Sequence, residues 1–184
     1  IVNLIMNLTV KDKNQIILDP GCGSGSFLVA AYNKLKELWG YGYTFGPLYE
    51  DEHRRILNQI YGIDINQFPA HLSVINLVLQ NPSVKVNKIN VIVSDFFDIK
   101  PGYATLSGFE GISTEGNKTT VRIPTVFDVV IGNPPYIRQE LLSEREKNKI
   151  IELIEHEYNR KLYVGNAPPN VNKDVIILDK QSDI

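Results

Sequence analysis

The residues with the clearest chemical potential form the short run Asn133-Pro134-Pro135-Tyr136, which follows an apolar run at residues 126–131. Consecutive prolines fix φ and lack a backbone N–H, so they hold the carbonyl groups of this segment in place. The Asn133 amide oxygen and a neighbouring carbonyl can accept hydrogen bonds from an exocyclic amino group, and the Tyr136 ring offers a stacking face. The pattern predicts a site for a planar amine. The alternative is a proline-rich turn that closes a core strand.

A glycine-rich loop joins an apolar run at residues 15–19 to a helical pattern that follows at once. Its residues are Asp19, Pro20, Gly21, Cys22, Gly23, Ser24 and Gly25. Glycines let the backbone approach a ligand, and the helix start presents free N–H groups. A dinucleotide fingerprint would place its third glycine at Ser26, and Asp19 would repel a pyrophosphate. The loop therefore favours a ligand with a cationic amino group, such as S-adenosylmethionine.

Two further carboxylates follow apolar runs of strand length, Asp64 within residues 60–65 and Asp95 after residues 89–94. A carboxylate at the end of the second strand suits a ribose diol, because it can accept from both hydroxyl groups. Asp95 suits the adenine amino group of the cofactor, with Phe96 against the ring. For each acid the alternative is a helix cap or a solvated strand end. Acids at three successive strand ends, after such a loop, favour a ligand site.

The composition sets limits on the class of protein. The 184 residues are 43% hydrophobic and 22% charged, which predicts one globular domain, and the net charge of -2 excludes a global basic field for nucleic acid. The single cysteine, Cys22, excludes an internal disulfide, and three widely spaced histidines predict no metal site. No apolar run reaches membrane-spanning length. We therefore expect a cytoplasmic protein without a membrane partner.

The remaining chain supplies the elements that must position these residues. Helical patterns cover residues 1–8, 27–38, 51–57, 66–79 and 143–158, and strand patterns cover 15–19, 60–65, 89–94, 126–131 and 175–178, with a hairpin around 115–117. On the helix at 66–79 the spacing predicts a buried face of Phe68, Leu72, Ile75 and Leu79. The alternation predicts an α/β fold with a doubly wound parallel sheet. Ligands of such sheets sit where the strand order reverses, which would gather Asp19, Asp64, Asp95 and Asn133.

On these motifs the chain resembles the S-adenosylmethionine-dependent adenine DNA methyltransferases. More narrowly, it resembles the methylase core of bifunctional type II (type IIG) restriction-modification enzymes. Residues 19–28 look like the family's cofactor loop, and residues 131–140 look like its catalytic motif. Gly62-Ile63-Asp64 and the segment from Ser94 to Phe97 fall where the ribose-binding and adenine-binding motifs lie. The resemblance implies a Rossmann-like methyltransferase sheet, incomplete at the C-terminus. It also implies a single catalytic core over residues 1–184, cut at both ends and without a target-recognition domain.

The resemblance also implies roles for individual residues. The catalytic residues would be Asn133, Pro134, Pro135 and Tyr136, and the cofactor-binding residues would be Asp19, Pro20, Gly21, Gly23, Gly25, Phe27, Asp64, Ile65, Asp95, Phe96 and Asn133. The reaction implied is direct methyl transfer to an adenine flipped out of double-stranded DNA, without a metal. Alternatives are the same chemistry on a guanine of RNA or a glutamine of a protein, or cofactor binding without turnover. For the isolated chain we expect weak cofactor binding and little or no activity.

Overall fold

The structure is a computed structural model that describes residues 1–41, 48–99, 109–112, 118–133, 143–158, 161–164 and 175–178. The chain divides into two compact units, Ile1–Pro134 and Pro135–Ile184, and each is described by itself. The expectation of one catalytic core over residues 1–184 stays a prediction.

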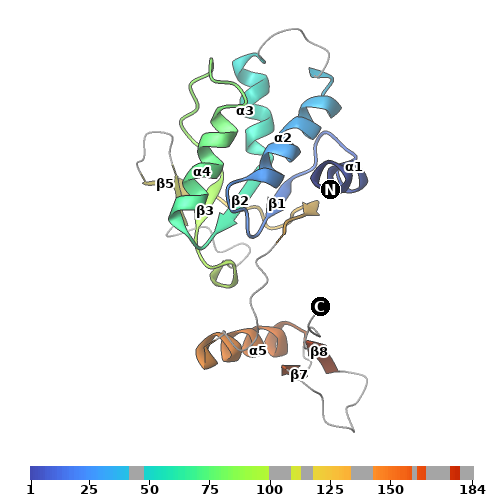
Figure 1. Ribbon diagram of the computed structural model, residues 1–184, viewed down its shortest axis with the longest axis vertical. Coiled ribbons are helices and arrows are strands. Elements are labelled where there is room, and N and C mark those ends of the chain that lie inside the picture. Colours follow the sequence, from blue (N-terminus) through green and yellow to red (C-terminus); the bar gives the residue numbers. More distant parts are fainter. Residues whose placement is uncertain are drawn as a thin grey trace. The chain divides into compact units, whose positions relative to one another are not determined.

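The first unit is built on a sheet whose central strands are parallel (Figure 1). Its strands are β1 (Ile17–Asp19), β2 (Ile60–Asp64), β3 (Val91–Val93), β4 (Phe109–Ile112), β5 (Lys118–Val121) and β6 (Val129–Val130). The order is β5-β4-β3-β2-β1-β6, in which β3, β2, β1 and β6 run parallel and the hairpin β4-β5 is antiparallel. The predicted parallel sheet and hairpin are confirmed.

The next strands in sequence, β2 and β3, lie on one side of β1 in the sheet, and the last strand, β6, lies on its other side. Helices α2 (Ser26–Leu38) and α3 (Glu50–Asn58) connect β1 to β2, and α4 (Gln67–Val78) connects β2 to β3. A 3₁₀ turn, η2 (Phe96–Asp98), and the hairpin lie between β3 and β6, while α1 (Val2–Thr9) precedes the sheet. The strand order therefore reverses at β1, which is the defining feature of a doubly wound sheet.

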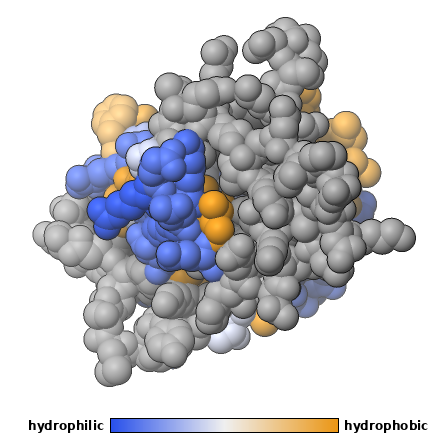
Figure 2. All heavy atoms as spheres, turned by 90° about the horizontal axis from the view of Figure 1, so that it is seen from below, coloured by the Kyte–Doolittle hydropathy of each residue, from blue (hydrophilic) through white to orange (hydrophobic). Residues whose placement is uncertain are grey.

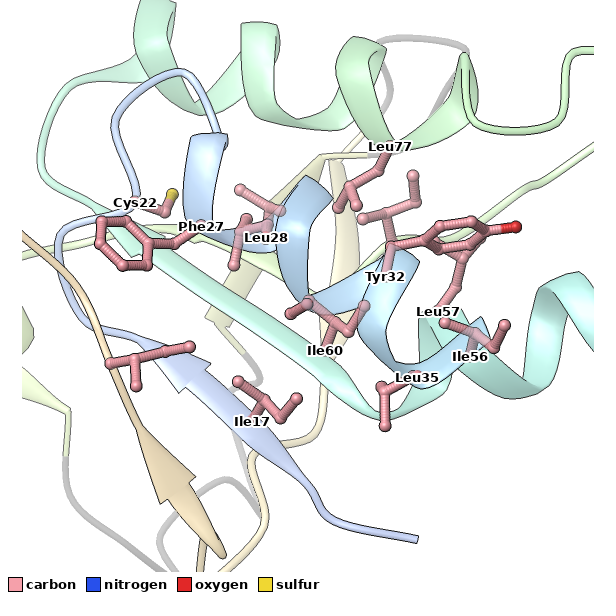
Figure 3. Close-up of a cluster of buried hydrophobic side chains, with 14 of the residues drawn as sticks. Ile17, Cys22, Phe27, Leu28, Tyr32, Leu35, Ile56, Leu57, Ile60 and Leu77 are labelled. Atoms are coloured by element: carbon pink, nitrogen blue, oxygen red, sulfur yellow. The ribbon is translucent and has the colours of Figure 1, made fainter. Parts of the chain in front are cut away.

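The larger part of the core lies between α2 and the sheet (Figure 3). The buried side chains of α2 are Phe27, Leu28, Ala31, Tyr32 and Leu35, and they meet Ile17 of β1 and Ile60 of β2 in one cluster. Burial of each large aliphatic side chain stabilises the fold by roughly 1.5–3 kcal/mol. This cluster fixes the start of α2, and with it the glycine loop that precedes the helix.

The opposite face of the sheet is also buried. Leu18, Ile63 and Ile92 from the three adjacent strands form a second cluster with Ile123. Tyr61 and Phe127 extend it through an edge-to-face contact, with ring centroids 5.4 Å apart. Parallel strands covered on both faces read as continuous apolar runs, which is why β1 and β3 do not alternate in the sequence.

The buried face of α4 is not the predicted one. Phe68 is 73% exposed, Ile75 51% and Leu79 58%, and the side chains that α4 buries are Ala70, Ser73, Val74 and Leu77. The helix carries apolar residues on two faces, so periodicity alone could not decide between them. The face with the small residues Ala70 and Ser73 lies inward because it lets the helix backbone come close to the glycine loop.

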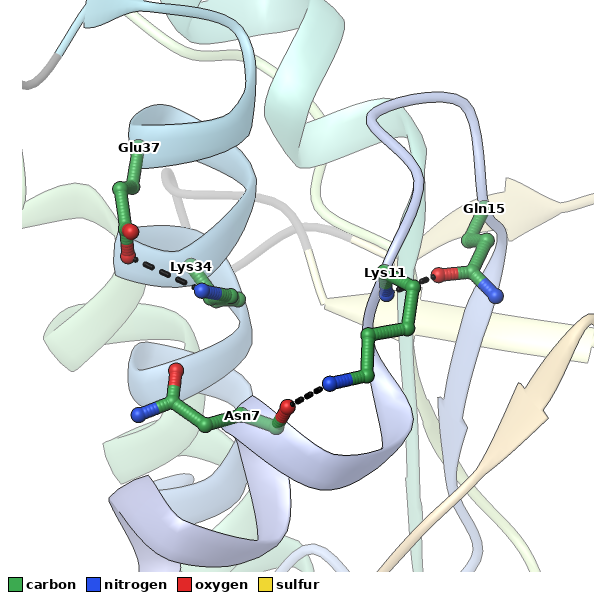
Figure 4. Close-up of polar contacts among 5 residues, drawn as sticks. All are labelled: Asn7, Lys11, Gln15, Lys34 and Glu37. Atoms are coloured by element: carbon green, nitrogen blue, oxygen red, sulfur yellow. Dashed lines mark hydrogen bonds and ion pairs between the residues drawn. The ribbon is translucent and has the colours of Figure 1, made fainter.

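Polar contacts close the turn between α1 and β1 (Figure 4). The backbone N–H groups of Lys11 and Asp12 donate to Gln15 Oε1 at 2.8 and 3.0 Å, and Lys11 Nζ donates to the Asn7 carbonyl oxygen. Gln59, just after α3, donates from Nε2 to the carbonyl oxygens of Lys13 and Gln15 at 2.7 and 3.0 Å. These contacts fix the point at which β1 enters the sheet.

The second unit contains helix α5 (Glu144–Tyr158) and strands β7 (Lys161–Val164) and β8 (Val175–Leu178), which pair in parallel. The helix predicted from residue 143 and the strand predicted at 175–178 are confirmed. In Figure 2 hydrophilic side chains gather in one group on the face seen from below, with hydrophobic ones beside them. Within the described residues, no helix has the length and apolar character that a membrane span requires.

Candidate active site

The carboxyl ends of the parallel strands meet at one edge of the sheet. Asp19 at the end of β1 is in register with Gly62 of β2, and Asp64 at the end of β2 is in register with Val93 of β3. On the other side of β1, Leu18 pairs with Val130 of β6. This edge therefore collects the glycine loop, Asp64 and the start of the Asn133 segment at the point where the strand order reverses.

Gly132 lies close to the Asp19 carboxylate at this edge. A Cβ atom on Gly132 would lie 2.5 Å from Asp19 Oδ1, so a side chain at position 132 would force the carboxylate or the backbone to shift. The same oxygen accepts the Gly21 N–H at 3.1 Å. Asp19 is only 1% exposed. The hydrogen bond from Gly21 fixes the start of the glycine loop, and a direct contact of Asp19 with a ligand's amino group stays a prediction.

The buried position of Asp19 changes its protonation. Burial raises the pKa of the Asp19 carboxyl to about 6, the hydrogen bond from Gly21 opposes this, and the negative charge of Asp64 raises the pKa further. An ionised carboxylate is costly in a site with little solvent. At neutral pH the edge nevertheless carries negative charge, which favours a cationic ligand over a phosphate.

The Asp64 carboxylate accepts two backbone hydrogen bonds, one from the glycine loop and one from the residue before α4. Its Oδ2 accepts the Gly23 N–H at 2.9 Å, and its Oδ1 accepts the Asn66 N–H at 2.8 Å, just before α4. Cys22 N–H in turn donates to the Ile63 carbonyl oxygen at 2.8 Å. The glycine loop is therefore fastened to the end of β2, and the Asp64 carboxylate stays half-exposed at the edge.

The glycine loop leads directly into α2. Gly23 has φ 52° and Gly25 has φ 88°, a left-handed conformation that side chains rarely adopt. Gly25 is the N-cap of α2, and no side chain caps the helix. The first N–H groups of α2 are consequently available for a ligand at the edge.

The other predicted cofactor residues occupy different environments. Ile65 is 66% and Phe96 is 41% exposed, so apolar surface flanks Asp64 at the ends of β2 and β3, and Asp95 is half-buried beside it. Pro20 and Gly21 are half-buried in the loop. Phe27 instead lies in the core cluster near Cys22 (Figure 3). The Phe27 side chain packs in the core, so only the Phe27 backbone could contact a ligand.

Two observations limit the reactions that this site can support. Burial raises the pKa of the Cys22 thiol to about 12, which makes it a packing residue rather than a nucleophile. Across the described residues no group of side chains is suited to hold a metal ion. Asn133 is exposed at the end of β6, whereas Pro134, Pro135 and Tyr136 lie outside the described residues.

The sequence reasoning missed two polar residues on α4 that contact the glycine loop. Ser73 Oγ donates to the Gly23 carbonyl oxygen at 2.7 Å, and Asn76 Nδ2 donates to the Ser24 carbonyl oxygen at 2.9 Å. A serine and an asparagine three positions apart, on a largely apolar helix, were the available signal. Neighbours at this spacing share one helix face.

Comparison with known proteins gives the chain a family. The model of the N-6 DNA methylase family matches residues 1–178. The type II methyltransferase M.BstVI of Geobacillus stearothermophilus is 30% identical over 193 residues, covering 100% of this chain and 31% of that protein. The restriction enzyme and methyltransferase RM.BcgI of Heyndrickxia coagulans is 32% identical over 82 residues, covering 44% of this chain and 12% of that protein.

Among solved structures, the type IIL restriction-modification enzyme MmeI in complex with DNA matches with a TM-score of 0.41 and 17% identity. That match covers 85% of this chain and 22% of that one. A likeness at this level adds nothing to the topology described above. The chain spans less than a third of the length of M.BstVI and RM.BcgI.

The raised pKa of Asp19 predicts a pH-dependent stability. The folded protein binds this proton more tightly than the unfolded chain, so the stabilisation by the proton is present below about pH 4 and is lost as the pH rises through 6. In Asp19→Asn this contribution is absent. Relative to the wild type, the free energy of unfolding of the variant should rise between pH 4 and pH 7, by at most about 3 kcal/mol. Urea unfolding across this range measures the difference, and a constant difference would contradict the assignment.

Proposed function

The chain belongs to the N-6 DNA methylase family, and on this premise we propose that it is the core of an adenine-specific DNA methyltransferase of a restriction-modification system. The reaction is transfer of a methyl group from S-adenosylmethionine to the exocyclic amino group of adenine. The observation that supports the proposal most strongly is the closeness of Gly132 to the Asp19 carboxylate, because it sets the residue directly before Asn133 beside the residue that leads into the glycine loop. A methyl donor and an acceptor amine must meet at such a junction.

The residues of the edge fit S-adenosylmethionine. When bound, the cofactor supplies the methyl group of its sulfonium. The carboxylates of Asp19 and Asp64 favour a ligand that carries positive charge, and they disfavour the pyrophosphate of a dinucleotide. The glycines at positions 23 and 25 expose loop backbone, and the uncapped start of α2 offers N–H groups to the carboxylate of the methionine end.

We assign the nucleoside end of the cofactor to the ends of β2 and β3. Asp64 has lone pairs beyond its two backbone hydrogen bonds, so it can accept from the ribose hydroxyl groups. The exposed apolar side chains of Ile65 and Phe96 offer faces for the adenine ring, and Asp95 can accept from its amino group. These four side chains sit at or just after the ends of the neighbouring strands β2 and β3, where a ribose and the adjoining adenine could bind together.

The acceptor side of the reaction is assigned to the Asn133 segment. The lone pair of an adenine amino group is delocalised into the ring, which makes the nitrogen a poor nucleophile. Acceptance of its N–H bonds by the Asn133 amide oxygen and the Pro134 carbonyl would shift the nitrogen toward sp³ geometry, and Tyr136 would hold the base by stacking. Catalysis then rests on placement, with the adenine flipped out of double-stranded DNA.

The proposal predicts the chemical product. The protein, incubated with S-adenosylmethionine carrying a radioactive methyl group and with duplex DNA, should yield labelled N6-methyladenine after digestion to nucleosides, at no more than the low level expected of the isolated chain. Asp64→Ala should lower both cofactor affinity and labelling, since it removes the proposed ribose acceptor. Label in RNA or in protein glutamine, with none in adenine, would overturn the choice of acceptor. Absence of cofactor binding by the wild type in calorimetry would overturn the proposal as a whole.

The contact that carries the proposal is tested by Gly132→Ala. The new Cβ would lie 2.5 Å from Asp19 Oδ1, so the end of β6 or the glycine loop must shift. We expect a loss of roughly 1–3 kcal/mol in the free energy of unfolding and a clear loss of methyl transfer. Val130→Ala, two residues earlier in β6, is the control, because Val130 is 59% exposed and its truncation introduces no new atom near Asp19. Equal transfer by Gly132→Ala and the wild type would show that the contact does not matter.

A further inference from the structure

Two side chains of α4 hold consecutive carbonyl groups of the glycine loop. Ser73 Oγ donates to the Gly23 carbonyl oxygen at 2.7 Å, and Asn76 Nδ2 donates to the Ser24 carbonyl oxygen at 2.9 Å. Ser73 is fully buried, so its hydroxyl has no solvent to bond with in place of the loop. A buried hydroxyl with a specific acceptor fixes the geometry of that acceptor.

Helix α4 packs so closely against the glycine loop that neither can shift easily. A Cβ atom on Gly25 would lie 3.0 Å from Ser73 Cα and 3.1 Å from Ser73 Oγ. Cys22 Sγ lies 3.5 Å from the same hydroxyl oxygen. Ser73 therefore contacts three residues of the loop, and the missing side chain at position 25 is what lets α4 come this close.

The Gly23 residue is bound at both of its backbone polar groups. Its N–H donates to Asp64 Oδ2 at 2.9 Å, and its carbonyl oxygen accepts from Ser73. In a trans peptide the C=O of one residue and the N–H of the next point in opposite directions. Because the Gly23 carbonyl points to α4, the Ser24 N–H points away from α4. Ser24 is exposed, so this donor faces the open side of the loop.

We propose that Ser73 and Asn76 are positioning residues for the cofactor loop, and that they hold the Gly23 and Ser24 carbonyl groups so that the Ser24 N–H is presented to the ligand. This inference rests on the proposed function, since it takes the ligand to be S-adenosylmethionine. Neither side chain touches the ligand itself. Together they convert a flexible glycine-rich segment into a pre-ordered binding surface, which reduces the ordering cost of binding.

The test uses Ser73→Ala, Asn76→Ala and the control Gln80→Ala. Gln80 Nε2 donates to the Asn76 carbonyl oxygen within the helix, so its removal also deletes one hydrogen bond of this segment but none to the loop. Titration calorimetry should show S-adenosylmethionine binding weakened roughly 3- to 10-fold in each loop variant and less than twofold in the control. Urea unfolding of all three variants separates this effect from a general loss of stability.

A spectroscopic signal tests the geometry directly. In ¹H–¹⁵N spectra without ligand, the Ser24 amide signal should move in Ser73→Ala and in Asn76→Ala, and it should keep its position in Gln80→Ala. Wild-type affinity in both loop variants, with an unmoved Ser24 signal, would overturn the inference and leave the proposed function intact. If the wild type itself fails to bind the cofactor, the proposed function fails, and the Ser24 signal alone decides whether the two residues order the loop.

Discussion

The site depends on the close approach of β6 to the end of β1, which the glycine at position 132 permits. Strand β6 is short, and hydrogen bonds to β1 and the residue before it, made just before and just after β6, hold its register. Ile16 N–H donates to Asp128 Oδ2 at 2.7 Å, and Ile131 N–H donates to the Leu18 carbonyl oxygen at 2.9 Å. With the register fixed in this way, Gly132, directly before Asn133, lies close to Asp19 and Pro20. A shift of one residue would turn the segment to the opposite face.

Residues of three different elements contact the glycine loop. Asp19 at the end of β1 and Asp64 at the end of β2 accept hydrogen bonds from the loop, and Ser73 on the inner face of α4 donates one to it. Two carboxylates at one edge cost stability, since like charges repel and Asp19 is buried. Under the proposed function, the same charges would favour a ligand with a sulfonium and an ammonium group. Such a conflict between stability and charge is typical of functional sites.

Much of the fold and part of the site could be predicted from the sequence. The meeting of the strand ends at Asp19 and Asp64 could be predicted because the carboxyl ends of parallel strands share one edge. The hairpin was readable because its β-branched residues follow a turn signal. The inner face of α4 was not, since Phe68 and Ile75 gave an equally good helical stripe and only tertiary packing selects between the two. The burial of Asp19 and the contacts of Ser73 are likewise products of packing, which local patterns do not encode.

The central claim is that S-adenosylmethionine binds at the edge formed by the glycine loop, Asp64 and the end of β3. Mapping of amide signals in ¹H–¹⁵N spectra during titration of the wild-type protein with the cofactor tests it most directly. The account predicts that the largest changes fall on Gly21, Gly23, Ser24, Ile65 and Phe96. Changes confined to the outer face of α4, or none at saturating cofactor, would contradict it.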